Sequence, residues 1–363
     1  MPVDPHAGPQ EFVRELERTD RTPPSAGGSD DLTGKVVAGR YRVLDTIGQG
    51  GMGSVYRVEH IEIGKQCAIK VLHSVYGQDD QQRRRFLREA RAASTIAHEN
   101  VVDVTDFGPS PNGSVFLAME LLVGEELSTL LGREGALPWA RVKPMVLQIC
   151  EALGAAHDKG IFHRDVKPEN CFRVKRGANH DFIKVLDFGI AKIMNAEVSA
   201  DLSLSQTGAV FGTPQYMSPE QAMGNPVDHR TDIYAMGVVI YEMLAGKVPF
   251  DGPSHLEILT RQTTELPEPP RDVVPQIPEA VDAIVLRALQ KRPDARFQSI
   301  GELAAALAAV PTDGAATANE IPTPRTRPSL DHTRERLYIA IIVLLGLSVL
   351  AMGGVLATLA LRG

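Results

Sequence analysis

Two polar runs in the middle of the chain limit its fold more strongly than any other feature. The first, HRDVKPEN, occupies residues 163–170 and follows a predicted amphipathic helix. The second, IKVLDFG, occupies residues 183–189 and is typical of a buried strand that ends in a turn. Asp187 follows Asp165 by 22 residues, the length of a strand–turn–strand hairpin. Asn170 and Asp187 carry oxygen donors that suit Mg²⁺, so the two runs indicate a site rather than a surface turn.

Bulk composition excludes several classes of protein. The chain has 363 residues, of which 43% are hydrophobic and 23% charged, so most of it should be globular. A net charge of −7 gives no support for nucleic-acid binding. Cys67, Cys150 and Cys171 show neither disulfide-framework nor metal-ligand spacing, which indicates a reducing compartment. The start, MPVDPHAGPQEF, lacks the basic residues and apolar run of a signal peptide.

The last part of the chain has the composition of a membrane span. Residues 337–361 contain no charge, and as a helix they would extend roughly 37 Å, more than the ~30 Å hydrocarbon core. We therefore predict one C-terminal transmembrane helix. Four arginines precede it and only Arg362 and Gly363 follow, so the positive-inside rule places the N-terminal body in the cytoplasm, with no extracytoplasmic sensor domain. The predicted localisation is the cytoplasmic (inner) membrane, in a single-pass arrangement.

Composition also divides the chain into four parts. Residues 1–38 are rich in Pro, Gly and Asp and are predicted to form a flexible arm. Residues 39–308 alternate patterned segments with turns and form the predicted globular domain. Residues 309–336 form a Pro/Thr/Arg-rich juxtamembrane linker before the predicted helix over 337–361.

A glycine-rich turn lies between two β-like segments near the start of the globular part. Gly48, Gly50 and Gly53 fit the pattern G-x-G-x-x-G. Alone the pattern is weak, because glycines in a hairpin are usually turn residues. A dinucleotide fold would need a helix directly after them, and here a second β segment follows. A glycine-rich hairpin can instead press its backbone N–H groups against phosphates.

A lysine then interrupts a strand that is apolar on both sides. Lys70 lies in QCAIKVLH, where burial of an ammonium is costly unless an anion is near. Glu89 follows 19 residues later, beside the apolar side of a predicted helix. A solvent-facing lysine and a surface carboxylate are the alternative, but a Lys70–Glu89 pair would supply the missing charge.

Taken in order, these motifs resemble the bacterial Hanks-type (eukaryotic-like) serine/threonine protein kinase family. The set comprises the glycines, Lys70, Glu89, HRDVKPEN, DFG and SPE at 218–220, and the resemblance covers about three quarters of the chain. It implies an α+β, bilobal protein kinase fold. The β-rich N-lobe would span residues 40–119, the hinge 120–124 and the helical C-lobe 125–308. The runs DVKPEN and QYMSPEQ are typical of the serine/threonine branch.

The resemblance implies a role for each site residue, with ATP and Mg²⁺ as cofactors and Mn²⁺ as an alternative ion. Asp165 would accept the proton of the substrate hydroxyl, and Lys167 would meet the charge on the γ-phosphate. Lys70 would hold the α- and β-phosphates and pair with Glu89, while Asn170 and Asp187 would hold magnesium.

Ala68 would cover the adenine, Met119 would be the gatekeeper, and the Glu120 carbonyl and Leu122 amide would contact the base. The predicted nucleotide-binding residues are Ile47, Gly48, Gly50, Gly53, Val55, Ala68, Lys70, Met119, Glu120 and Leu122.

The resemblance also implies a regulatory set. Arg164 and Lys192 would form a basic pocket, and phosphate on Ser205 or Thr207 would dock the activation loop there. Thr213 matches the threonine that contacts the catalytic loop. Such phosphorylation would occur between molecules gathered on the membrane as a homodimer. Three further residues match structural positions of the family: Asp232, which braces the catalytic loop, and the buried ion pair of Glu220 with Arg296.

The sequence therefore predicts a membrane-anchored, ATP-dependent serine/threonine protein kinase that acts in signal transduction, with protein substrates and activation-loop autophosphorylation. A pseudokinase scaffold is one alternative, and the intact Lys70, Asp165, Asn170 and Asp187 argue against it. A small-molecule phosphotransferase of related fold is another. The long stretch between Asp187 and Glu220 favours a protein acceptor.

Overall fold

The structure, a computed structural model, describes residues 32–50, 53–72, 90–110, 115–188 and 213–312. All of them belong to the first of the two units into which the chain divides, residues 1–315. The predicted transmembrane helix over 337–361 lies outside the described residues. Among the helices of the described ranges, none has the length and apolar character needed to cross a bilayer.

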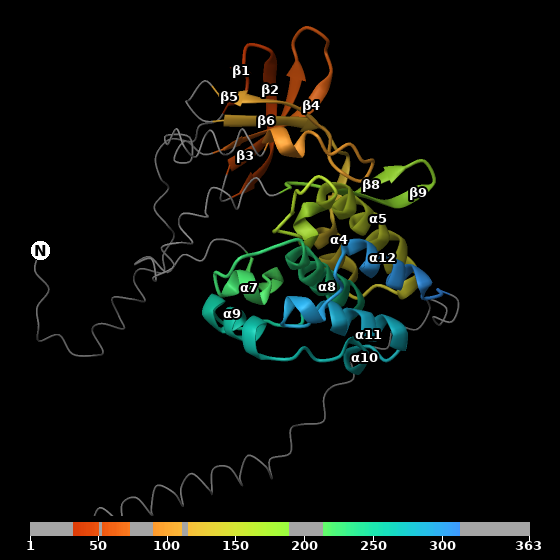
Figure 1. Cartoon of the computed structure of the whole chain (residues 1–363). Helices are drawn as coiled ribbons and strands as arrows, with labels where there is room; N and C mark the ends of the chain where they lie inside the picture. Colours follow the sequence, from red (N-terminus) through yellow and green to blue (C-terminus); the bar gives the residue numbers. More distant parts are fainter. Residues whose placement is uncertain (1–31, 51–52, 73–89, 111–114, 189–212, 313–363) are drawn as a thin grey trace, which may run out of the picture. The chain divides into compact units, whose positions relative to one another are not determined.

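Strands dominate the first part of the described chain, coloured red to orange in Figure 1. A six-stranded sheet has the order β1-β2-β3-β4-β6-β5, and each neighbouring pair is antiparallel. Consecutive strands from β1 to β4 pair in sequence order, whereas β6 lies between β4 and β5, so the chain crosses over after β4. The strands are β1 (Val36–Val37), β2 (Tyr41–Gly50), β3 (Gly53–His60), β4 (Gln66–Leu72), β5 (Val104–Pro109) and β6 (Val115–Glu120).

The sheet begins earlier than the sequence predicted. Strand β1 pairs with β2 through Val37 and Tyr41, and Val37 is buried in a small cluster with Val43 and Val58. Residues 32–38, assigned above to the flexible arm, are therefore part of the lobe. The strand has only two residues, too few for a recognisable alternation, and its burial depends on a partner strand.

Helices make up most of the second part, coloured from yellow through green to blue in Figure 1. Helix α8 is central, because 13 of its 16 residues are buried, and it ends at Gly246 in the left-handed conformation. The α-helices are α4 (Leu127–Glu134), α5 (Trp139–His157), α7 (Pro219–Ala222), α8 (Arg230–Ala245), α9 (His255–Thr264), α10 (Pro270–Val273), α11 (Glu279–Ala288) and α12 (Ile300–Ala309). Single 3₁₀ turns are η1 (Pro168–Asn170), η2 (Pro214–Tyr216) and η3 (Pro293–Ala295).

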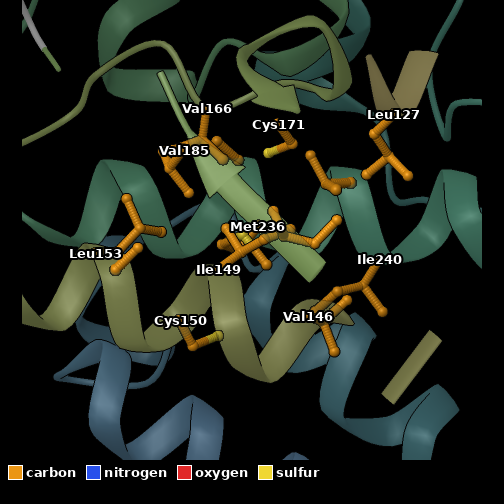
Figure 2. Packing of buried hydrophobic residues seen from close by; sticks show 14 of the residues in the cluster. Leu127, Val146, Ile149, Cys150, Leu153, Val166, Cys171, Val185, Met236 and Ile240 are labelled. Atoms are coloured by element: carbon orange, nitrogen blue, oxygen red, sulfur yellow. The ribbon is translucent and has the colours of Figure 1, made fainter. Parts of the chain in front are cut away.

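A second, three-stranded sheet carries the two polar runs. Its strands are β7 (Gly124–Glu126), β8 (Cys171–Arg176) and β9 (Asn179–Val185), in sequence order. The β8–β9 hairpin confirms the strand–turn–strand interpretation of the interval between the runs. Figure 2 shows why this sheet is firmly placed: Cys171 and Val185 of the hairpin point into the same apolar cluster as Ile149 of α5 and Met236 of α8.

Hydrogen bonds join β9 to the segment before β5. The Val102 N–H donates to the Val185 carbonyl at 3.0 Å, and the Val185 N–H donates to the Asn100 carbonyl at 2.7 Å. The Asn100 side-chain amide donates to the Ile183 carbonyl at 2.7 Å. The strand that leads to Asp187 is thus tied directly to the N-terminal lobe.

The C-terminal boundary also lies slightly beyond the predicted residue 308. Val310 is buried, and its carbonyl accepts a hydrogen bond from Lys143 of α5 at 2.7 Å. The Trp139 indole N–H donates to the Pro311 carbonyl at 3.2 Å. These contacts fasten the end of α12 to α5 and extend the domain by a few residues.

Candidate active site

An ion pair between the two lobes forms the centre of the site. Lys70 projects from the middle of β4, and its Nζ lies 2.6 Å from Oδ2 of Asp187, just after β9. The side chains are 21% and 26% exposed, so both charges can still meet a ligand. Asp187 has a φ of 54°, a left-handed conformation that is uncommon outside glycine and is a typical mark of functional sites.

A second carboxylate is held by the loop between α5 and η1. Lys167 Nζ lies 3.1 Å from Oδ2 of Asp165. The Asn170 side-chain amide donates to the Asp165 carbonyl at 2.8 Å and to its Oδ2 at 3.2 Å. The polar residues of HRDVKPEN therefore converge on Asp165, as their spacing suggested.

Asp232 at the start of α8 braces this loop, as predicted. Its carboxylate is fully buried and accepts backbone N–H bonds from His163 at 2.8 Å and from Arg164 at 2.7 Å. His157 Nε2 also lies 2.8 Å from Oδ2 of Asp232. These bonds hold Arg164 in a left-handed conformation, with a φ of 62°, directly before Asp165.

His163 connects the loop to the segment around Asp187. It is fully buried; its Nε2 lies 2.8 Å from the Leu186 carbonyl, and its ring centre lies 4.8 Å from that of Phe188, with the two rings tilted by 58°. Its Nδ1 accepts the Asp165 N–H at 3.2 Å. His163 is therefore a packing residue, and its hydrogen bonds link the two acidic segments.

The glycine-rich hairpin fits a ligand that approaches its backbone. At Gly53 a Cβ atom would lie 2.2 Å from the Val71 carbonyl oxygen, so the fold itself requires glycine there. At Gly48 and Gly50 the nearest protein atoms would lie 3.7 and 3.9 Å away, and packing requires no glycine. Val55 of β3 pairs with Gly48 on one side and with Lys70 on the other, so the glycine-rich hairpin lies beside the lysine, as a phosphate-binding hairpin would.

The predicted adenine residues lie along one strand pair. Ala68 of β4 and Met119 of β6 are direct partners, and both are buried. Leu122 and Val55 pack against the main core and are partly buried, whereas Ile47 is about half exposed. The Glu120 carboxylate accepts bonds from the Asp103 N–H at 2.9 Å and from Lys184 Nζ at 2.7 Å, which fixes the start of the predicted hinge.

Comparison with known proteins decides the family. Residues 41–306 match the protein kinase domain family. The chain belongs to this family. It is 43% identical over 284 residues to the serine/threonine-protein kinase pkn3 of Myxococcus xanthus, covering 78% of this chain and 52% of that protein. It is 39% identical over 279 residues to the probable serine/threonine-protein kinase PknB of Corynebacterium glutamicum, covering 75% and 42%.

Solved structures agree with the sequence relatives. The kinase resembles the crystal structure of the Mycobacterium tuberculosis PknI kinase domain with a TM-score of 0.60 and 29% identity, over 76% of this chain and 98% of that one. The expected bilobal fold and the expected membership of the bacterial Hanks-type family are thereby confirmed. The kinase spans about half the length, or less, of the curated relatives it matches.

Several predicted site residues of the kinase lie outside the described residues. They are Glu89, Lys192, Ser205 and Thr207, so the Lys70–Glu89 pair and the phosphate pocket remain predictions. Thr213 is described: it directly precedes η2, and its carbonyl accepts the Tyr216 N–H at 3.4 Å.

Sequence reasoning missed contacts between the kinase's catalytic loop and later segments. The Gln221 side chain of α7 donates to the Arg164 carbonyl at 2.9 Å. Ser218 forms a capping box with Gln221 at the start of α7. The pattern S-P-E-Q offered a signal for this cap, because Ser at the N-cap and Gln three residues later are its signature.

Proposed function

We propose that the chain transfers the γ-phosphoryl group of ATP to serine or threonine hydroxyls of proteins. The observation that carries the proposal is the position of Lys70, Asp187 and Asp165 on three separate segments, each held by its own hydrogen bonds. Phosphoryl transfer needs positioning and charge neutralisation more than covalent chemistry, and this arrangement offers both.

The chain's own residues divide the work. Asp165 accepts the proton of the acceptor hydroxyl, and Asn170 orients it through one bond to the carboxylate and one to the backbone carbonyl. Lys167, which now pairs with Asp165, is close enough to neutralise charge that develops on the transferred group. Lys70 holds nucleotide phosphates. Asn170 and Asp187 supply oxygen ligands for Mg²⁺, an ion that, when bound, neutralises phosphate charge.

Nucleotide binding is assigned to the N-lobe and the hinge. The hairpin with Gly48 and Gly50 covers the phosphates, while Ala68 and Met119 flank the adenine. The Glu120 carbonyl and the Leu122 amide provide the polar contacts to the base. Support comes from the register of β4 with β6, which brings Ala68 opposite Met119.

Activation by autophosphorylation is the regulatory part of the proposal. Phosphate on Ser205 or Thr207 docks on Arg164 and Lys192, since a phosphate carries about −1.5 to −2 charges at pH 7 and three strong acceptors. Support comes from the sequence of the loop and from the position of Arg164 beside Asp165. Mass spectrometry of active enzyme, with Asp165→Asn as the control, tests this. Full activity of Ser205→Ala/Thr207→Ala would contradict it.

We also propose that residues 337–361 anchor the kinase in the cytoplasmic membrane, with the catalytic domain in the cytoplasm. Support comes from the uncharged run and from the arginines before it. Gly353 and Ala357 form a small-xxx-small pair that would bring two anchors together for trans-autophosphorylation. Fractionation tests the anchor: the full-length chain should be in the membrane pool, and a chain without residues 337–363 should be soluble.

The activity itself is tested with labelled ATP, Mg²⁺ and dephosphorylated casein as a generic acceptor. Phosphoserine or phosphothreonine on casein, absent with Asp165→Asn, is the expected result. Nucleotide binding without transfer to any protein would indicate a pseudokinase scaffold. Transfer to small hydroxyl compounds but to no protein would indicate a small-molecule phosphotransferase.

A further inference from the structure

A glutamine of α9 reaches back to the segment that precedes α7. Gln262 is fully buried. Its Nε2 donates to two successive carbonyls, those of Gln215 at 2.5 Å and Pro214 at 3.3 Å. Its Oε1 accepts the Tyr234 hydroxyl of α8 at 2.5 Å. One side chain therefore uses both ends of its amide to tie η2 to two helices.

A lysine supports this glutamine from behind. Lys291 Nζ donates to the Gln262 carbonyl at 2.8 Å and to the Tyr234 hydroxyl at 3.3 Å. It also lies 4.0 Å from the centre of the Phe250 ring. No described carboxylate forms an ion pair with it, so carbonyl, hydroxyl and ring contacts hold the ammonium. Lys291 thus holds the backbone of Gln262, and it orients the side-chain amide indirectly, through the Tyr234 hydroxyl.

The segment that Gln262 holds leads directly to the catalytic loop. Tyr216 donates its hydroxyl to the Glu242 carboxylate of α8 at 2.6 Å. A few residues later, Gln221 donates to the carbonyl of Arg164, the residue before Asp165. A shift of residues 213–217 would therefore displace Gln221 and, through its hydrogen bond, the backbone of Arg164 next to Asp165. The nucleotide residues lie on other elements, namely β2, β3, β4, β6 and the hinge.

From this geometry we infer that Gln262 is a positioning residue for the protein acceptor. It fixes the carbonyls of Pro214 and Gln215, so that residues 213–217 present the acceptor hydroxyl to Asp165. The inference rests on the proposed function, since it names how that same site receives its acceptor. If Gln262 only stabilised the fold, its replacement would not selectively weaken acceptor binding. The inference instead predicts a lower affinity for the acceptor with an unchanged affinity for the nucleotide.

The decisive variant is Gln262→Glu. It keeps the size of the side chain and the acceptor for Tyr234, but it replaces the N–H donors with an oxygen that faces two carbonyl oxygens. With casein as the acceptor, we expect KM for casein to rise about ten-fold, the equivalent of one lost hydrogen bond. KM for ATP should stay within about two-fold of wild type.

Gln148→Glu is the matched control. Gln148 of α5 also donates through Nε2 to backbone carbonyls, those of Pro144 at 3.0 Å and Asp181 at 3.1 Å, away from residues 213–217. It should lower the thermal midpoint without changing KM for casein. A Gln262→Glu protein with a lowered midpoint and a wild-type KM for casein would overturn the inference.

A milder variant covers the case in which Gln262→Glu does not fold. Tyr234→Phe keeps the ring in place and removes only the hydroxyl that orients the amide. It should raise KM for casein about three-fold with KM for ATP unchanged, and an unchanged KM for casein would overturn the inference. Failure of the proposed function is distinguishable, because wild-type enzyme would then transfer no phosphate to casein at all.

Discussion

Two buried or partly buried ion pairs of this kinase differ in how completely their charges are satisfied. Arg296 has no exposed side-chain surface and makes five hydrogen bonds: two to the Glu220 carboxylate and three to the carbonyls of Gln290, Arg230 and Lys291. Lys70 and Asp187 are each more than one fifth exposed and meet at 2.6 Å. The first pair is closed to any ligand, and the second can exchange its partner for one.

The Glu220–Arg296 pair therefore stabilises the fold, whereas the Lys70–Asp187 pair is available for the reaction. Burial works against ionisation of Glu220, yet the bonds from Arg296 outweigh it and lower the pKa of the Glu220 carboxyl. Asp187 instead has a left-handed backbone, a form of local strain that the surrounding contacts must support. Variants of the Glu220–Arg296 pair should therefore lower stability, whereas variants of the active site should lower activity.

The largest effect should come from Asp165→Asn. The amide cannot accept the acceptor proton, so kcat should fall about 10³-fold or more. The bonds from Asn170 to the loop carbonyl remain, and the thermal midpoint should change little. Asp158→Asn, an exposed change of the same kind at the end of α5, should keep full activity. A near wild-type rate in Asp165→Asn would refute the assignment of the base.

Glu220→Ala should have the next largest effect, but on stability. It leaves the Arg296 charge buried without its anion, and the free energy of unfolding should fall by roughly 3–5 kcal/mol. Denaturant unfolding measures this. Lys247→Ala removes one partner of an exposed pair with Glu268 and should cost less than about 1 kcal/mol. Equal losses in the two variants would show that burial does not distinguish these pairs.

The third largest effect should come from Lys70→Met, on the use of ATP. Removal of one phosphate-binding cation should reduce kcat/KM for ATP about 10²-fold while the protein still folds. Nucleotide titration would detect the loss directly. Lys65→Met, at an exposed position just before β4, is the matched control and should bind nucleotide normally. Unlike Asp165→Asn, Lys70→Met should disturb nucleotide binding as well as transfer, and normal affinity would argue against its phosphate contact.

The sequence predicted the residues of the active site better than their contacts. Lys70, Asp165, Asn170 and Asp187 were identified from motifs whose spacing is local. The contact of Lys70 with Asp187 was not predicted, because it joins residues 117 positions apart and depends on how the lobes meet. The β8–β9 hairpin was predictable, since apolar runs around a turn specify it.

Other features had no local signal. Gln262 lies in a helix with many polar residues, and its burial depends on a backbone segment 47 residues earlier. Val36 and Val37 are too few residues to show an alternating pattern, and only pairing with β2 makes them a strand. In each case a distant partner decides the environment of the side chain, which periodicity and composition do not encode.

The smallest effect should come from Lys291, whose ammonium is held without a carboxylate among the described ion pairs. Burial, reinforced by the charge of Arg296, lowers the pKa of Lys291 from 10.5 to about 8. From about pH 8 to about pH 10.5 the unfolded chain keeps a proton that the folded chain loses, so this group makes stability rise with pH there. Below that range both states hold the proton and its contribution is constant. The free energy of unfolding of wild type relative to Lys291→Met should therefore increase from about pH 7 to about pH 10 in parallel denaturant titrations. A constant difference would mean that carbonyl and ring contacts stabilise the ammonium as well as water does.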